Sequence, residues 1–440
     1  MRSLGGFMVP LAIALGSLSL VENANLVMRP LLAVAILAGL LCFNGRFNKP
    51  ETAWIGLLAF SFIALVFSCI GSSAPDAVGT ALGRQGFMLL LAISLVMLLR
   101  DPQARMASLG GLLAILLAAG GAAAWVYLTF VPVYGFSYEG VRMIKGVALL
   151  DHGIGLNSLS YLAVIALFGW RIAYRPHPVA DMLLLALGFL CIFLLGSRAT
   201  LAALLIAWAS VRFLRFMWSA SPLVGAFGIA LLTSLAGLCV FILADYAVEI
   251  REIFGADLLR EISVGRTDMW GAGLEMWLQR PLFGWGPESW RDLMLEFLPG
   301  TGDRFLTLIG NLESGSFHNG FVTMAAERGT LGLLSAIAIQ IYLFRCAVQL
   351  YRGRDVLDER DRMMATLAPT LVLFMFLRSL AESSGLFGTA NGEVDYMTYF
   401  VSSYFVALYA EIERRKQAHL YEQIDESEGA PYEAPEPTRS

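Results

Sequence analysis

Apolar stretches long enough for membrane-crossing helices recur from the N-terminus to about residue 410. Polar connections separate them, and strand-like segments of ~10 residues with alternating apolar and polar positions are absent. Because helices satisfy their own backbone hydrogen bonds in lipid, this pattern predicts an all-α polytopic membrane protein. We expect about twelve transmembrane helices, at roughly 5–20, 26–43, 52–71, 82–99, 106–131, 153–170, 181–196, 199–216, 222–244, 318–344, 364–380 and 395–412.

Composition and basic residues refine this picture. The chain is 57% hydrophobic and 15% charged, which excludes a soluble domain with a polar surface. Lysine and arginine are concentrated in the connections on one side of the predicted helices, so that side and both termini should be cytoplasmic. The basic residues of that side are Arg46, Lys49, Arg100, Arg105, Arg171, Arg175, Arg212, Arg215, Arg345, Arg352, Arg354, Arg360, Arg362, Arg414, Arg415 and Lys416.

Four segments follow from this topology. Transmembrane helices occupy 1–244 and 318–412, and 245–317 forms one large periplasmic loop domain between the ninth and tenth helices. Within the loop, Thr267–Gln279 reads as a helix that ends at Arg280-Pro281. The acidic, proline-rich segment 413–440 has too few apolar residues to bury a core, so we expect a disordered cytoplasmic tail.

His318 is the leading candidate for catalysis. The chain has only four histidines, and this one lies at a predicted membrane surface where the long loop meets an apolar segment. An imidazole with a pKa of about 6.5 can accept a proton at neutral pH, which suits a general base. The alternative is a capping or interfacial histidine. Asn319 beside it could fix a tautomer or bind a sugar hydroxyl.

Arginines on the same side are candidates for binding an anion. Arg198 is a lone charge between two apolar segments, where burial is costly without an anionic partner. Guanidinium groups bind phosphate bidentately, so Arg198, Arg266, Arg142 and Arg84 could neutralise a pyrophosphate. The alternative is that they extend to the lipid headgroups or pair with protein carboxylates such as Asp268, Glu288, Glu313 or Glu382.

Other chemistries lack support in the sequence. The cysteines, five in number, lie within or at the ends of apolar segments and suggest neither a disulfide framework nor a zinc site. No Asp-x-Asp metal motif, phosphate-binding loop or serine nucleophile motif occurs outside the predicted cytoplasmic side. We therefore expect no metal and no cofactor.

Four motifs together resemble the O-antigen ligase/polymerase superfamily. They are Gly265–Trp270, Arg280–Gly286, His318–Phe321 and Glu327–Gly332, in this order and spacing within about residues 190–345. The resemblance implies an inner-membrane glycosyltransferase of GT-C-like fold. Such an enzyme moves a glycan from undecaprenyl pyrophosphate to an acceptor at the periplasmic face, and in the ligase branch the acceptor is a lipid A-core sugar hydroxyl.

The resemblance also implies roles for individual residues. His318 matches the histidine that activates the acceptor, while Arg266 and Arg198 match arginines that hold the donor pyrophosphate. Direct attack by the acceptor would invert the anomeric centre without a metal. One large loop and a short tail favour the ligase over the polymerase and the protein O-oligosaccharyltransferase of the same superfamily. A transporter of anionic lipid or glycan, with His318 coupling protons, is the alternative from another class.

Overall fold

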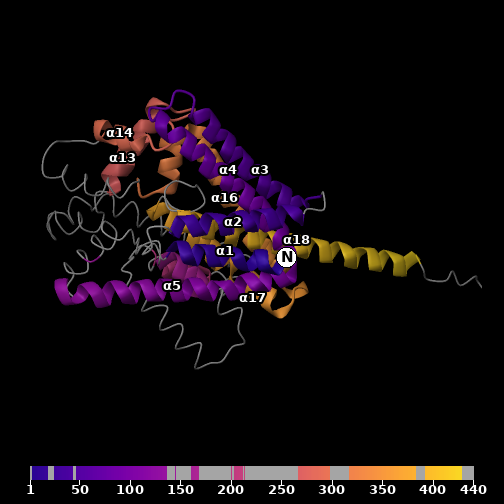
Figure 1. Cartoon of the computed structure of the whole chain (residues 1–440). Coiled ribbons are helices and arrows are strands. Elements are labelled where there is room, and N and C mark those ends of the chain that lie inside the picture. Colours follow the sequence, from indigo (N-terminus) through magenta and orange to yellow (C-terminus); the bar gives the residue numbers. More distant parts are fainter. Residues whose placement is uncertain are drawn as a thin grey trace, which may run out of the picture.

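The computed structural model describes residues 2–17, 24–42, 46–135, 144, 160–167, 200, 203–211, 213, 266–297, 317–382 and 392–428. Within these ranges every regular element is an α-helix or a short 3₁₀ helix, and no strand occurs. The predicted all-α class is confirmed for this part of the chain. Figure 1 shows most of the helices gathered in one bundle.

The helices of this bundle come from both ends of the chain. The N-terminal part contributes five long helices, and the C-terminal part contributes three, with two shorter helices at one end of the bundle. Residues 160–167 and 203–211 are also helical. The bounds are α1 (Arg2–Ser17), α2 (Ala24–Leu41), α3 (Lys49–Ser68), α4 (Pro75–Leu98), α5 (Pro102–Tyr134), α13 (Arg266–Gln279), α14 (Trp290–Phe297), α16 (Gly320–Gly353), η1 (Arg354–Val356), α17 (Glu359–Ala381) and α18 (Gly392–Glu428).

Five of the described helices are long and apolar enough to cross a membrane, namely α3, α4, α5, α16 and α17. They match five of the predicted spans, and they identify a multi-pass membrane protein. Helices α1 and α2 contain shorter apolar stretches. The predicted spans at 181–196 and 222–244 lie outside the described residues, and those at 153–170 and 199–216 are described only in part. The count of about twelve therefore stays a prediction.

Helix α18 is not one of these five, and its predicted span contains several buried polar residues. Asp395, Ser402 and Ser403 are buried in the bundle, together with most side chains from Tyr396 to Ile412. The helix contacts α1, α3, α4, α16 and α17. Because other helices surround α18, its side chains contact protein and not lipid. Polar side chains are tolerated in such a position.

The last helix extends further along the chain than we expected. Helix α18 continues to Glu428, so residues 413–428, which we expected to be disordered, are helical. Ion pairs at helical spacing support this extension: Glu411 lies 2.7 Å from both Arg414 and Arg415, and Glu413 lies 3.6 Å from Lys416. Such pairs add helix stability without a buried core, which a criterion based on apolar content does not detect.

Basic connections predicted to share one membrane side meet at one end of the bundle. Arg100 Nε donates to Glu51 Oε1 at 2.8 Å, and Arg415 Nη1 donates to the Val356 carbonyl at 2.8 Å. The first turns of α1 pack against the backbone at Ala104. Figure 1 shows the N-terminus and the outgoing part of α18 at this end, with α13 and α14 at the opposite end.

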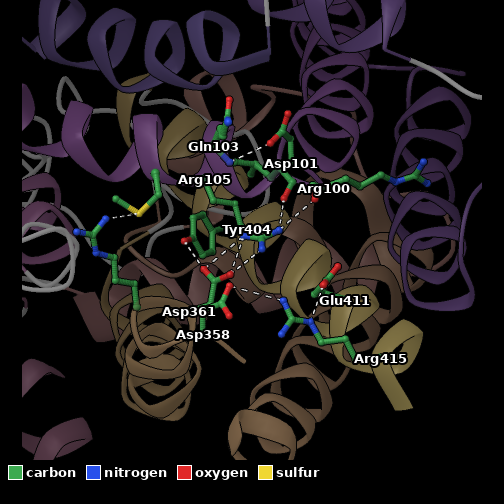
Figure 2. A network of polar contacts seen from close by, with 12 residues as sticks. Arg100, Asp101, Gln103, Arg105, Asp358, Asp361, Tyr404, Glu411 and Arg415 are labelled. Atoms are coloured by element: carbon green, nitrogen blue, oxygen red, sulfur yellow. Dashed lines mark hydrogen bonds and ion pairs between the residues drawn. The ribbon is translucent and has the colours of Figure 1, made fainter. Parts of the chain in front are cut away.

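A buried ion pair joins three helices at the same end (Figure 2). Arg105 of α5 donates from Nη2 and Nε to Asp361 Oδ2 of α17, at 2.6 and 3.1 Å. Tyr404 of α18 donates to Asp361 Oδ1 at 3.3 Å, and Arg105 Nη1 donates to the Leu99 carbonyl at 2.9 Å. Both charged side chains are almost completely buried, so each depends on the other for compensation.

We predict that Asp361→Asn destabilises the bundle. It leaves the Arg105 charge buried without an anionic partner, a change that typically costs about 3–5 kcal/mol. The matched control is Asp358→Ala, whose side chain is 71% exposed and lies 3.6 Å from Arg415. An exposed pair of this kind contributes less than about 1 kcal/mol. Thermal unfolding of the purified variants in detergent checks this, and equal midpoints for the two would contradict it.

Candidate functional site

Helix α16 is broken at Gly329, which has φ 65° and ψ −159° inside an otherwise helical segment. Only glycine adopts this backbone conformation readily. The break removes the partners that the carbonyl groups of Ala326 and Glu327 would have in a continuous helix. Buried backbone groups need replacement partners, so the break requires another segment beside it.

The turn at 280–286 supplies those partners. Trp285 N donates to the Ala326 carbonyl at 3.1 Å, and Gly286 N donates to the Glu327 carbonyl at 2.9 Å. These backbone bonds join residues about forty positions apart in the chain. Two of the motifs on which the family resemblance rests are therefore in direct contact, as a docked pair.

Hydrogen bonds in the reverse direction complete the exchange. Thr330 donates to the Pro281 carbonyl from its backbone N at 2.6 Å and from its hydroxyl at 2.7 Å. Trp277 Nε1 donates to Thr330 Oγ1 at 3.2 Å, so α13 is linked to the same point. The turn and the helix each satisfy backbone groups that the other leaves unpaired.

Two glycines allow the backbones to approach this closely. A Cβ at Gly284, where φ is 69°, would overlap the Glu327 backbone. A Cβ at Gly329 would overlap the backbone at Leu282 in the same way. Both positions combine a positive φ with the absence of space, so neither accepts another residue without displacing the turn.

Helix α13 is placed by this docking and by a small apolar core. The predicted helix Thr267–Gln279 is confirmed, since α13 runs from Arg266 to Gln279 and ends just before Pro281. Its inner face packs on Phe317, the residue before His318, with a side chain that is completely buried. The cluster consists of Met269, Ala272, Met276, Trp290, Phe317 and Ala326.

His318 lies between this core and the start of α16. Its φ is 50°, and within the described ranges Glu288 is the other non-glycine residue with positive φ. A left-handed conformation costs a non-glycine residue about 1–3 kcal/mol and persists where the surroundings impose it. Here Phe317 anchors one side, and on the other Asn319 Oδ1 caps α16 by accepting from Phe321 N and Val322 N at 3.0 and 3.1 Å.

The imidazole of His318 contacts a carboxylate. His318 Nδ1 lies 3.0 Å from Glu382 Oε2, with side chains 17% and 10% exposed. Glu382 is the residue at which α17 ends, and its own backbone N donates to the Arg378 carbonyl at 2.8 Å. An ionised carboxylate only accepts hydrogen bonds, so Nδ1 is the donor in this contact, and in a neutral imidazole of that tautomer Nε2 is the basic nitrogen. This arrangement can orient a general base.

Of the four candidate arginines, Arg84 is the one whose side-chain contacts are described. Its Nη1 lies 3.9 Å from Glu288 Oε1, so it contacts one of the protein carboxylates that we considered as an alternative to pyrophosphate. The backbone N of Glu288 in turn donates to Glu327 Oε1 at 3.0 Å, which links α4 through the turn to α16. This contact places Arg84 beside the turn, and its role in binding a pyrophosphate stays a prediction.

The other three arginines are described less fully. Arg266 begins α13 one helical turn before Met269, so its backbone is carried by the helix that packs on Phe317. Its side chain, and Arg198 and Arg142 entirely, lie outside the described residues. Asn319 uses its carbonyl oxygen for the helix cap, and the cap leaves only its amide nitrogen for a substrate.

Polar and charged side chains also line the interior of the bundle. Gln85 Nε2 donates to Tyr399 OH at 3.3 Å, and Tyr161 OH lies 2.7 Å from Thr398 Oγ1. The guanidinium of Arg378, one turn before Glu382, lies 4.5 Å from the ring centre of Tyr161. In the described ranges no three His, Cys, Asp or Glu side chains form a group that could hold a metal.

Comparison with known families identifies this region. Residues 183–337 match the model of the O-antigen ligase family. This segment is therefore similar to that family. The match includes Arg198, Arg266, His318 and both docked motifs, so the predicted resemblance to the O-antigen ligase/polymerase superfamily is confirmed. Members of this family are glycosyl-transferring enzymes, either ligases or polymerases. The comparison with curated proteins found no match.

Glu382 is a residue of the candidate site to which the sequence analysis gave no role in catalysis. It lies beyond the matched segment and was considered only as a partner for arginine. A usable signal existed, because the predicted span at 364–380 ends on the same membrane side on which the span at 318–344 begins. Glu382, just after the span at 364–380, and His318, at the start of the span at 318–344, are therefore expected at the same membrane surface.

We predict that Gly329→Ala undocks the turn. Alanine cannot adopt the glycine conformation without strain, and its Cβ would overlap Leu282, so a loss of roughly 2–6 kcal/mol is expected from strain and overpacking together. The control is Gly271→Ala in α13, where a Cβ meets no atom within 4 Å and φ is not positive. Limited proteolysis between residues 280 and 290 and the unfolding temperature check this. Equal protection of the two variants would refute the docking.

Proposed function

We propose that the protein is an O-antigen ligase. It transfers a glycan from undecaprenyl pyrophosphate to a sugar hydroxyl of lipid A-core at the periplasmic face of the inner membrane, and the product is lipopolysaccharide. The observation that carries the proposal is the His318–Glu382 contact at the start of α16, inside and beside a glycosyl-transferring family domain. A carboxylate-oriented imidazole is what activation of a sugar hydroxyl needs.

The chemical step follows from that pair. His318 Nε2 accepts the proton of the acceptor hydroxyl while its oxygen attacks the anomeric carbon of the donor. The bond between that carbon and the pyrophosphate oxygen breaks, and undecaprenyl pyrophosphate leaves with the bonding electrons. A single displacement inverts the anomeric centre, and the proton on His318 is released afterwards. No redox change and no cofactor are required.

Arginines stabilise the departing anion in this scheme. Arg266 and Arg198 bind the pyrophosphate oxygens, on which negative charge develops, and Arg142 adds to the positive field. The position of α13 against Phe317 supports a role for Arg266 close to His318. Arg84, whose guanidinium lies 3.9 Å from Glu288 beside the turn, adds to the same positive field, and Asn319 contributes an amide N–H toward a sugar hydroxyl.

The orientation in the membrane is part of the proposal. The end that gathers Arg100, Arg105 and Arg415 is cytoplasmic by the distribution of basic residues, and the N-terminus and the outgoing part of α18 lie there. His318, α13 and α14 then face the periplasm. Substrates at that face are membrane lipids with glycan heads, which fits a site at the end of an apolar bundle.

We predict that His318→Ala abolishes transfer. Loss of a general base lowers the rate by about 10²–10⁴-fold. The assay incubates purified protein with undecaprenyl-pyrophosphate glycan and lipid A-core in EDTA, and His419→Ala, in the outgoing part of α18, is the matched control. Lipid A-core that stays unmodified while the donor glycan lengthens would identify a polymerase. If wild-type protein does neither with active substrates, the glycosyltransferase proposal fails and transport is the next activity to measure.

We predict that Glu382→Gln acts only through His318. Misplacing a reacting group by ~1 Å costs up to about 10²-fold in rate, so kcat should fall while KM for both substrates changes little. In the double variant with His318→Ala the Glu382→Gln change should have no further effect, because no base remains to be oriented. Equal losses in the presence and absence of His318 would show that Glu382 serves stability alone.

A further inference from the structure

An exposed apolar edge runs along the segment that carries α13. Leu274, Leu278, Leu282 and Phe283 are 45%, 69%, 64% and 42% exposed, although each is a large apolar side chain. Leu274 and Leu278 lie one turn apart on α13, and Leu282 continues the same spacing into the turn. We call these four residues the apolar edge.

The apolar edge continues the outer surface of helices that are apolar enough to cross a membrane. Phe283 stacks on Phe67 in the last turn of α3, with ring centres 5.6 Å apart. The side chains of Ile63 and Phe67 on α3 are 49% and 41% exposed, and Ile70, just after the helix, is 73% exposed. For a membrane-crossing helix such side chains face lipid, so the edge begins where the lipid-facing surface of α3 ends.

The depth of the edge follows from its attachment to α16. The turn that carries Leu282 and Phe283 docks at Gly329, inside the candidate span Gly320–Val356. That span has 37 residues, whereas crossing the hydrocarbon core takes about 20. Gly329 can therefore lie at the boundary between acyl chains and headgroups, with the first turns of α16 outside the core.

Residues typical of that boundary flank the edge. The guanidinium of Arg280 lies 3.9 Å from the ring centre of Trp285, and its Nη1 donates to the Gly71 carbonyl at 2.9 Å. Trp277 is half-buried between the edge and Thr330. Tryptophan and arginine prefer the headgroup zone, where an apolar stem and a polar tip are both accommodated.

We propose that the apolar edge is inserted into the acyl-chain region of the same leaflet, so that α13 is a monotopic interfacial helix. Its partner is the bilayer itself, and the lipid acyl chains are what cover the four side chains. The polar residues Glu275 and Gln279, on the adjacent face of α13, remain in water. This placement rests on exposure and docking and holds whichever reaction the site performs.

The test uses single cysteines at the edge in proteoliposomes. Leu278→Cys and Leu282→Cys are made in a background in which Cys42, Cys69, Cys191, Cys239 and Cys346 are serine, with Glu275→Cys as the matched control. Each is labelled with an environment-sensitive fluorophore. We expect the labels at 278 and 282 to be quenched several-fold more by phosphatidylcholine carrying an acyl-chain nitroxide than by aqueous iodide, and the label at 275 to show the reverse.

Two outcomes would overturn the proposal. Iodide quenching at 278 and 282 equal to that at 275 would place the edge in water, and protection from both quenchers would mean that protein, such as a second copy of the chain, covers it. If the variant with all five cysteines replaced by serine does not fold, hydroxyl-radical footprinting of the unmodified protein in nanodiscs tests whether water reaches the apolar edge. Leu278, Leu282 and Phe283 should then be oxidised several-fold less in nanodiscs than in the denatured protein, and equal oxidation in the two would overturn the proposal.

Discussion

The hydrogen bonds between the 280–286 turn and the break in α16 are the interaction on which the rest of the site depends. A helix broken within an apolar bundle leaves backbone groups without partners, and in a low-dielectric interior each such group costs several kcal/mol. Trp285 and Gly286 satisfy the carbonyl groups, and Pro281 accepts from Thr330. The break at Gly329 and the ordered turn are therefore mutually dependent, and together they place α13 beside Phe317.

Helix α17 connects the two ends of the molecule. At its start Asp361 forms the buried pair with Arg105, and at its end Glu382 meets His318. The buried pair opposes sliding of the helix, because displacement would separate two charges that are almost completely buried. The position of the carboxylate at the site is thus held from the opposite end of the bundle, while the buried Phe317 and the Asn319 cap hold the backbone on either side of His318.

Sequence patterns predicted the elements whose pattern is local. The apolar spans that became α3, α4, α5, α16 and α17, and the helix at 267–279, follow from length and periodicity. The break at Gly329 was not predicted, because a single glycine between Arg328 and Thr330 carries no sign of a distant partner. His318 was identified because the chain has few histidines and this one lies at a predicted membrane surface. Glu382 was not, because its contact with His318 is visible only in the tertiary structure. Helix α18 beyond residue 412 was missed because ion pairs, not buried area, support it.

The geometry of α16 relates the apolar edge to the proposed chemistry. Both substrates of the proposed reaction are lipids whose tails stay in the bilayer while their heads react. From Gly329 to the start of α16 the helix spans up to about 14 Å at 1.5 Å per residue, and His318 lies just beyond. With the edge among the acyl chains, the imidazole stands at the height of headgroups and pyrophosphate. The same docked turn thereby determines both the depth of the protein in the leaflet and the height of its base above it.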